Sequence, residues 1–158
     1  MWKGSDHPVC CGPVRVSTAM PMMTKKGKVQ ARELPSTVAR SGKKAKRTFA
    51  KAHDAAAAEY GEGERAMRTA WSALKHTHEK VGDRWERKDK AGPSDDQAKG
   101  GKSTRRETAG GVNATATKKH LYGVARELGI KGRSTMSKSE LVKAIVKEND
   151  RRTAKARR

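Results

Sequence analysis

Residues 121–146, LYGVARELGIKGRSTMSKSELVKAIV, decide the fold of the C-terminal part of the chain. Apolar residues recur at helical spacing before Gly129, and glycine readily ends a helix because it adopts the left-handed conformation without steric cost. Ser137 and Glu140 then stand three residues apart, as in a capping box, and precede a second apolar stripe. The apolar positions are Leu121, Val124, Ala125, Leu128, Leu141, Val142, Ile145 and Val146. This pattern predicts a helix–loop–helix unit over residues 117–149.

The charge of the chain is concentrated in two blocks. The 158 residues carry a formal net charge of +20 and the isoelectric point is near 10.4. Residues 25–91 and 118–158 each carry a net charge of +9, whereas residues 92–117 carry +1. This distribution indicates two basic modules rather than one basic tail, and it makes a polyanion the first partner to consider.

The first basic block predicts a pair of antiparallel helices. Ser41 can cap one helix, Gly61 can end it, and the short Gly-Glu-Gly connection favours a helical hairpin. Each helix has an apolar stripe at spacings of three and four. The stripes are Ala45, Phe49, Ala52, Ala56 and Tyr60 in the first helix, and Met67, Trp71, Leu74, His78, Val81 and Trp85 in the second. Leu34-Pro35 is expected to open a short helix or turn before the pair.

The remaining segments are predicted to lack a core of their own. Residues 89–116 are rich in Gly, Ser, Thr, Ala and charge, which is typical of a flexible linker. Residues 1–29 have no periodicity and are expected to be a disordered extension. Within them, residues 1–19 are interpreted as an upstream extension, with the working protein starting near Met20.

The predicted fold class is therefore all-α, with two small helical domains joined by a flexible linker and with disordered termini. The domains expected in chain order are a disordered N-terminal extension (1–29), a helical domain (30–88), a linker (89–116), a helix–loop–helix domain (117–149) and a basic tail (150–158).

The first block carries the signature residues of a known family. They are Leu34-Pro35, Val38, Phe49, Ala52-His53-Asp54, Tyr60, Arg65-Ala66, Arg68, residues 70–75 (AWSALK), Lys80 and Gly82-Asp83-Arg84-Trp85. In these positions the block resembles the ChaB family over about sixty residues. The resemblance implies a small helical domain and a role in regulating cation transport, through a sodium/calcium–proton antiporter.

The second block carries a different signature. Its residues are Leu121, Ala125, Leu128-Gly129-Ile130, Gly132, Met136, Lys138-Ser139-Glu140-Leu141 and Ala144-Ile145. Here the chain resembles the N-terminal helical domain of the transcription termination factor Rho, and is similar in outline to the SAP module. The resemblance implies binding to nucleic acid. In Rho an OB-fold that grips RNA bases follows this piece, whereas here a basic tail follows and Tyr122 is the only aromatic residue of the block. Binding driven by phosphates and weakly selective for sequence is therefore expected.

Basic side chains supply the candidate binding residues. The expected nucleic-acid contacts are Lys118, Lys119, Lys131, Arg133, Ser134, Lys138, Lys143, Arg151 and Arg152. Lys131 and Arg133 are expected to reach outward from the loop. A second candidate basic patch is Lys43, Lys44, Lys46 and Arg47, at the start of a predicted helix, where positive charge opposes the helix dipole and an anionic partner would relieve it. The alternative for each residue is an ordinary solvated charge.

Motifs for catalysis and for metal or cofactor binding are not found in the sequence. His76 and His78 face different directions on a helix, and two adjacent cysteines, Cys10 and Cys11, complete no zinc ligand set. We expect no catalytic residue, no metal and no cofactor. No apolar run approaches the roughly 20 residues of a membrane span, and the cysteine usage favours a reduced, cytoplasmic protein.

The sequence leaves two functions open. The first is a non-enzymatic protein that binds RNA or DNA through phosphate contacts, in transcription termination or its regulation. The second is a regulator of a cation transporter acting through protein–protein contacts, in which the ChaB-like domain holds a protein partner. The sequence does not distinguish RNA from DNA as the nucleic-acid partner.

Overall fold

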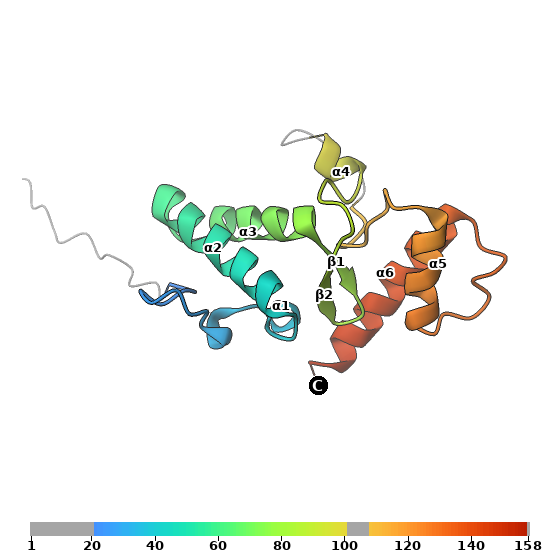
Figure 1. Ribbon diagram of the computed structural model, residues 1–158, viewed down its shortest axis with the longest axis horizontal. Helices are drawn as coiled ribbons and strands as arrows, with labels where there is room; N and C mark the ends of the chain where they lie inside the picture. The colour runs from blue at the N-terminus through green and yellow to red at the C-terminus, as the bar shows by residue number, and fades with distance from the viewer. Residues whose placement is uncertain (1–20, 101–107, 158) are drawn as a thin grey trace, which may run out of the picture.

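The computed structural model describes residues 21–100 and 108–157. A 3-10 turn covers Ala31–Glu33, and the other elements in chain order are α1 (Ser36–Ala39), α2 (Lys43–Tyr60), α3 (Glu64–Thr77), β1 (His78–Val81), β2 (Arg84–Arg87), α4 (Asp96–Lys99), α5 (Lys118–Glu127) and α6 (Lys138–Lys155). Figure 1 shows the α2–α3 pair and the α5–α6 pair on opposite sides of the β1–β2 hairpin. Across the described ranges, no helix is both long enough and apolar enough to cross a lipid bilayer.

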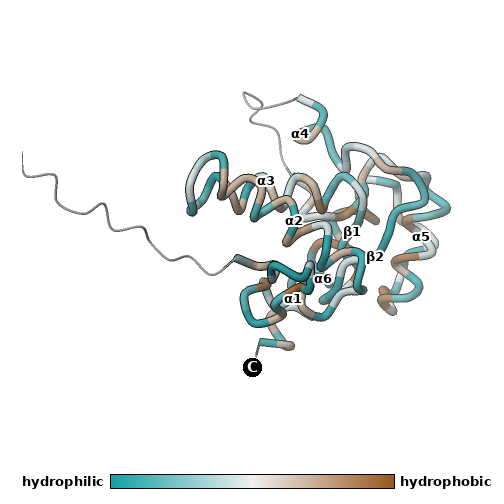
Figure 2. The backbone as a smooth tube through the Cα atoms, turned by 60° about the vertical axis from the view of Figure 1, so that its left-hand side comes forward, coloured by the Kyte–Doolittle hydropathy of each residue, from teal (hydrophilic) through white to brown (hydrophobic). Residues whose placement is uncertain are grey.

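The α2–α3 pair forms the predicted helical hairpin. Gly61 ends α2 with a φ of 78°, a conformation that side chains oppose. Phe49 is fully buried and meets Trp71 edge-on, with ring centroids 4.8 Å apart. Apolar and polar residues alternate along α3 in Figure 2, as an amphipathic helix requires. This first core also contains Leu34, Val38, Ala45, Ala50, Ala70, Leu74 and Trp85.

The β-hairpin corrects the predicted all-α class. The helix expected to continue to Trp85 ends at Thr77, and β1 and β2 pair antiparallel with Val81 opposite Arg84. Gly82, with a φ of 66°, opens the two-residue loop between them, a conformation that such tight hairpin loops need. The protein is mostly helical with one small sheet.

The α5–α6 pair forms the predicted helix–loop–helix unit. The first helix packs Leu121 and Ala125 against Leu141 and Ile145 of the second, and all four side chains are fully buried. Val81 of β1 joins this second core. The hairpin therefore contributes to both cores, because Trp85 of β2 belongs to the first.

The segment before α5 corrects the expectation of a flexible linker, as far as the structure describes it. The carbonyl of Gly111 accepts a hydrogen bond from the Lys80 N–H at 2.9 Å, so the segment pairs with β1. Val112 is 2% exposed and lies in the second core. Asp95 accepts hydrogen bonds from the N–H groups of Ala98 and Ala109. Ala109, Gly111 and Val112 of this segment are thus buried in the fold, although Thr108, Gly110 and Thr115 remain exposed.

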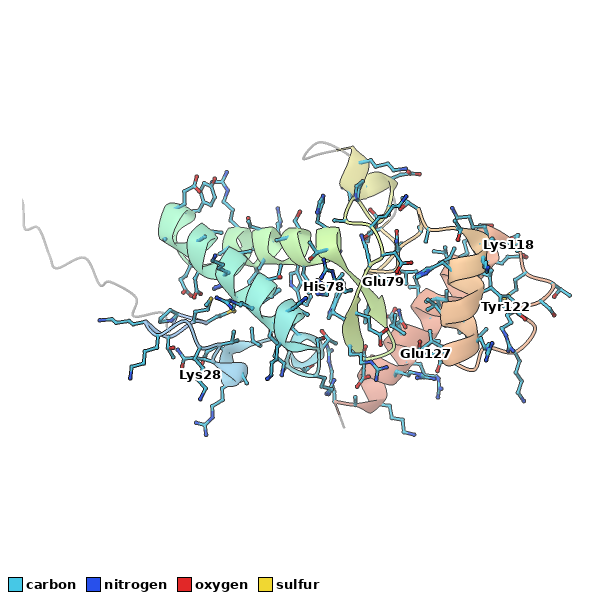
Figure 3. All side chains as sticks on the ribbon, in the orientation of Figure 1. Lys28, His78, Glu79, Lys118, Tyr122 and Glu127 are labelled. Atoms are coloured by element: carbon cyan, nitrogen blue, oxygen red, sulfur yellow. The ribbon has the colours of Figure 1, made fainter. Side chains whose placement is uncertain are left out.

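Polar contacts also join the two helical pairs. Glu79 of β1 and His120 of α5 form a hydrogen bond of 2.8 Å, and Figure 3 shows Glu79 between the two helical pairs. Arg84 of β2 donates to Glu127 of α5 at 3.2 Å. These contacts, with the shared hairpin, hold the two cores side by side.

The chain ends depart from the predicted boundaries. Asp54 of α2 accepts hydrogen bonds from the N–H groups of Met22 and Met23 at 2.9 and 2.8 Å, so this part of the predicted N-terminal extension packs on α2. The interpretation of residues 1–19 as an upstream extension lies outside the described residues. At the other end, α6 continues to Lys155, into the predicted basic tail.

Candidate nucleic-acid interface

The ends of α5 and α6 are fixed by side-chain caps. Thr117 accepts a hydrogen bond from the His120 N–H at 3.2 Å. Ser137 and Glu140 form the predicted capping box, since each side chain bonds the backbone N–H of the other residue. Gly129, with a φ of 72°, turns the chain out of α5. These caps fix where the basic side chains of the unit emerge.

Five of the predicted phosphate contacts are free cations. Each lysine is exposed, and none of their ammonium groups makes a hydrogen bond or ion pair within residues 21–100 and 108–157. They are Lys118, Lys119, Lys131, Lys138 and Lys143. An ammonium group with no partner inside the protein can bind an external anion without first breaking a hydrogen bond or ion pair.

Two of these lysines share an electrostatic neighbourhood. Hydrogen bonds from Ser137 lower the pKa of Glu140, and the positive charges of Lys118 and Lys143 lower it further. Lys118 at the start of α5 and Lys143 in the second turn of α6 therefore both lie within electrostatic range of Glu140. Figure 3 shows Lys118 at the upper, N-terminal end of α5, with Glu127 at the other end.

Lys138 has a more acidic setting. It lines a hollow of about 280 Å³ together with Asp95, Asp96 and Lys99. The two carboxylates oppose binding of an anion there, so Lys138 is a weaker candidate than Lys118 or Lys143.

Arg133 departs from the expectation that it reaches outward. Its Nη1 donates to the carbonyl of Ile130 at 3.0 Å, and its guanidinium lies over the ring of Tyr122, 5.5 Å from the centroid. Its Nε is buried without a hydrogen-bond partner among the described residues. Arg133 therefore closes the loop on itself and covers the aromatic ring, whereas Lys131 and Ser134 are exposed.

Arg151 and Arg152 are already paired. Glu148 accepts hydrogen bonds from both guanidinium groups, at 2.7 Å from Arg151 and 3.0 Å from Arg152. These bonds lower the pKa of Glu148 to about 2. Arg152 also donates to the carbonyl of Leu128 at 2.7 Å and so joins the end of α5 to α6. Arg151, Arg152 and Glu148 together carry a net charge of +1. The two arginines mainly make contacts within the protein, so they are weaker candidates for binding phosphate.

The second candidate patch divides in two. Lys44 and Arg47 line a cavity of about 470 Å³ between α2 and the hairpin, whereas Lys43 and Lys46 do not. Sequence reasoning missed the other cations of this cavity, Lys51, Arg87 and Lys88. The spacing of Lys44, Arg47 and Lys51 on one helical face could have identified Lys51. Arg87 could not be found in this way, because it belongs to a strand that the sequence did not predict.

The architecture defines a small basic protein with two helical modules that share a β-hairpin. The family model of ChaB matches residues 34–88, and the family model of the Rho termination factor N-terminal domain matches residues 117–152. Both resemblances predicted from the sequence are confirmed, in the predicted order. The first match suggests regulation of cation transport and the second suggests nucleic-acid binding. No curated protein and no solved structure matches the chain significantly.

Proposed function

We propose that the protein binds RNA or DNA through the α5–α6 unit, without catalysing a reaction, and acts in transcription termination or its regulation in the cytoplasm. The observation that carries the proposal is that five predicted contact lysines on the region matched by the Rho N-terminal domain are exposed and unpaired among the described residues. Backbone phosphates are the natural partners of such charges.

The proposed binding is weakly selective for sequence. Tyr122, the aromatic residue of the unit, is 37% exposed, and its ring faces the guanidinium of Arg133. The guanidinium covers one face of the ring, which reduces the surface on which a base can stack. Phosphate contacts fix position but carry no sequence information directly.

Salt titration of binding to an oligonucleotide tests this proposal. With five phosphate contacts, the logarithm of affinity for duplex DNA is expected to fall against the logarithm of salt concentration with a slope of about −4.5. The triple variant Lys118→Gln/Lys131→Gln/Lys143→Gln is expected to flatten the slope by about 2.7. The matched control is Lys25→Gln/Lys26→Gln/Lys28→Gln, which removes the same charge from an exposed turn on the other module.

Two results decide against nucleic-acid binding by this unit. One is a full chain that ignores both RNA and DNA in dilute buffer. The other is an equal change of slope in the triple variant and its control, which would mean diffuse attraction to the whole cationic chain.

The second candidate function, regulation of a cation transporter through protein–protein contacts, is supported by the ChaB match at residues 34–88. In that case the basic surface of α2 would meet an acidic partner segment. A chain that binds acidic peptides more tightly than oligonucleotides of equal charge would favour this second function.

A further inference from the structure

A cationic cavity of about 470 Å³ lies between α2 and the hairpin. The α2 wall is formed by Lys44, Arg47, Thr48 and Lys51. These positions are spaced by three, one and three residues, so they share one face of the helix, opposite the face that buries Phe49. The volume falls within the range of about 300–1,000 Å³ that is typical of small-molecule sites.

The far wall adds positive charge from a different part of the chain. Arg87 and Lys88, at the end of the hairpin, line the cavity together with His78 at the start of β1. Asp89 is the one carboxylate among the described residues of the lining, and its side chain is 92% exposed. With His78 neutral and the other charged side chains ionised, five cations and one anion give these lining residues an excess of four positive charges.

Most of these cations have no internal partner. Among the described residues, no hydrogen bond or ion pair is made by the charged groups of Lys44, Arg47, Lys51 or Arg87. Lys88 is the exception, because its Nζ donates to the Gly92 carbonyl and to Ser94, both at 2.8 Å. Like charges held around one hollow repel one another, and an anion placed between them relieves that repulsion.

We propose that this cavity binds a compact oligophosphate, as found in inorganic tripolyphosphate or in the phosphate chain of a nucleoside triphosphate. A nucleic-acid strand spreads its negative charge at one per about 3.4 Å. An oligophosphate instead concentrates several negative charges in a single group. That concentration matches an excess of four positive charges around one cavity. Arginine and lysine together supply the donors that phosphate oxygens prefer.

This site is separate from the proposed nucleic-acid contacts. It lies on the region matched by ChaB, and it uses none of the five free lysines of the α5–α6 unit. Either proposal therefore stands or falls without the other.

Calorimetric titration of the full chain with inorganic tripolyphosphate tests the proposal. Saturable binding is expected, and Arg47→Gln/Arg87→Gln is expected to weaken it by about ten- to a hundredfold, since each lost group removes a charge-assisted hydrogen bond. The control Lys25→Gln/Lys28→Gln removes the same charge away from the cavity and is expected to change affinity by less than about twofold. Absence of saturable binding, or equal weakening in both variants, would overturn the proposal.

His78 gives a second readout that needs no variant of the cavity. Burial lowers the pKa of His78, and the charges of Arg87 and Lys88 lower it further. A bound oligophosphate offsets those charges, so the pKa of His78, followed by imidazole NMR, is expected to rise on addition of tripolyphosphate. His78→Gln identifies the resonance. An unchanged pKa at saturating tripolyphosphate would contradict the site even if the arginine variant fails to fold.

Two further titrations separate the sources of the phosphate. Adenosine triphosphate is expected to raise the pKa of His78 as tripolyphosphate does, whereas adenosine, which lacks phosphate, is expected to leave it unchanged. Tighter binding of the nucleotide than of tripolyphosphate would identify a nucleotide ligand. An oligonucleotide that raises the pKa of His78 at lower phosphate concentration than tripolyphosphate would overturn the proposal in favour of a nucleic-acid strand.

Discussion

The side chain of Asn149 in α6 binds the hairpin loop at Gly82: its Oδ1 accepts from the Gly82 N–H at 2.7 Å. The Nδ2 of the same amide donates to the carbonyl of Lys80 at 2.8 Å. Asn149 is 1% exposed, although it lies on a helix whose other buried residues include Leu141 and Ile145. One buried amide thus joins the module matched by Rho to the hairpin of the module matched by ChaB.

Replacing Asn149 is expected to destabilise the whole chain. In Asn149→Leu both hydrogen bonds are lost and a buried N–H and carbonyl are left without partners, at a cost of about 3 kcal/mol. Urea unfolding followed by tryptophan fluorescence measures this loss, because Trp71 and Trp85 report on the first core. The control Lys147→Ala changes an exposed residue of the same helix and is expected to stay within about 0.5 kcal/mol of wild type. A similar value for both variants would mean that the amide does not join the modules.

Gly111 is expected to tolerate no side chain. Its φ is 94°, and a Cβ built there would lie 2.5 Å from Cη2 of Trp85. Gly111→Ala is therefore expected to cost about 3 kcal/mol, from backbone strain together with overpacking. Gly123→Ala is the matched control, since Gly123 is exposed within α5 and its Cβ would meet open space. That control is expected to gain about 0.5 kcal/mol in the free energy of unfolding.

Equal unfolding free energies for the two alanine variants would contradict the packing of residues 108–112 on the hairpin. Such a result would restore the flexible linker that composition alone predicted.

Local patterns predicted the helices well where one core decided the packing. Ala45, Phe49 and Ala56 of the first stripe are buried as predicted, whereas Tyr60 at its end is 48% exposed. The capping box at Ser137 and Glu140 is confirmed. In each case the signal depends on residues three or four apart, so the sequence alone carries it.

The sequence pattern did not predict the β-hairpin because its apolar residues belong to two different cores. Val81 and Trp85 are four apart, which fits one face of a helix. In the structure Trp85 pairs with Lys80, so Val81 and Trp85 lie on opposite faces of the two-stranded sheet and enter different cores. Only the tertiary arrangement distinguishes these two interpretations.

The sequence predicted which basic residues belong to the candidate site, but not which of their side chains are free to bind an anion. Lys118 and Lys143 are free as expected, whereas Arg133 and Arg152 bond backbone carbonyls within the fold. The spacing of Glu148 and Arg152, four apart on one helix, can be read from the sequence, but the second partner of Arg152 is the Leu128 carbonyl at the end of another helix. Long-range contacts of this kind leave no local pattern.

Glu148 is expected to make stability depend on pH in the acidic range. Hydrogen bonds from Arg151 and Arg152 hold its pKa at about 2 in the folded chain, below the usual value of 4.5. Because the folded pKa is the lower one, the stabilisation is complete above about pH 4.5 and is lost as the pH falls toward 2. The arginines are partly exposed, so solvent screening limits the contribution to about 1 kcal/mol.

Urea unfolding of wild type and Glu148→Gln over a series of pH values measures this contribution. The two proteins are expected to differ at pH 7 and to converge as the solution approaches pH 2. Glu62→Gln is the control, because Glu62 is exposed and has no ion pair among the described residues. A difference for Glu148→Gln that does not change with pH would exclude ionisation of this carboxylate as its cause.

Lys131 and Arg152 are expected to respond in opposite ways to loss of charge. Lys131→Gln removes a free cation, so the salt slope for duplex binding is expected to flatten by about 0.9 while stability stays within about 0.5 kcal/mol. Arg152→Gln breaks the bonds to Glu148 and to the Leu128 carbonyl, so it is expected to cost about 1–2 kcal/mol and to leave the slope unchanged. Salt titration and urea unfolding of both variants measure the two effects. A flatter slope for Arg152→Gln with wild-type stability would mean that this guanidinium leaves its partners to bind phosphate.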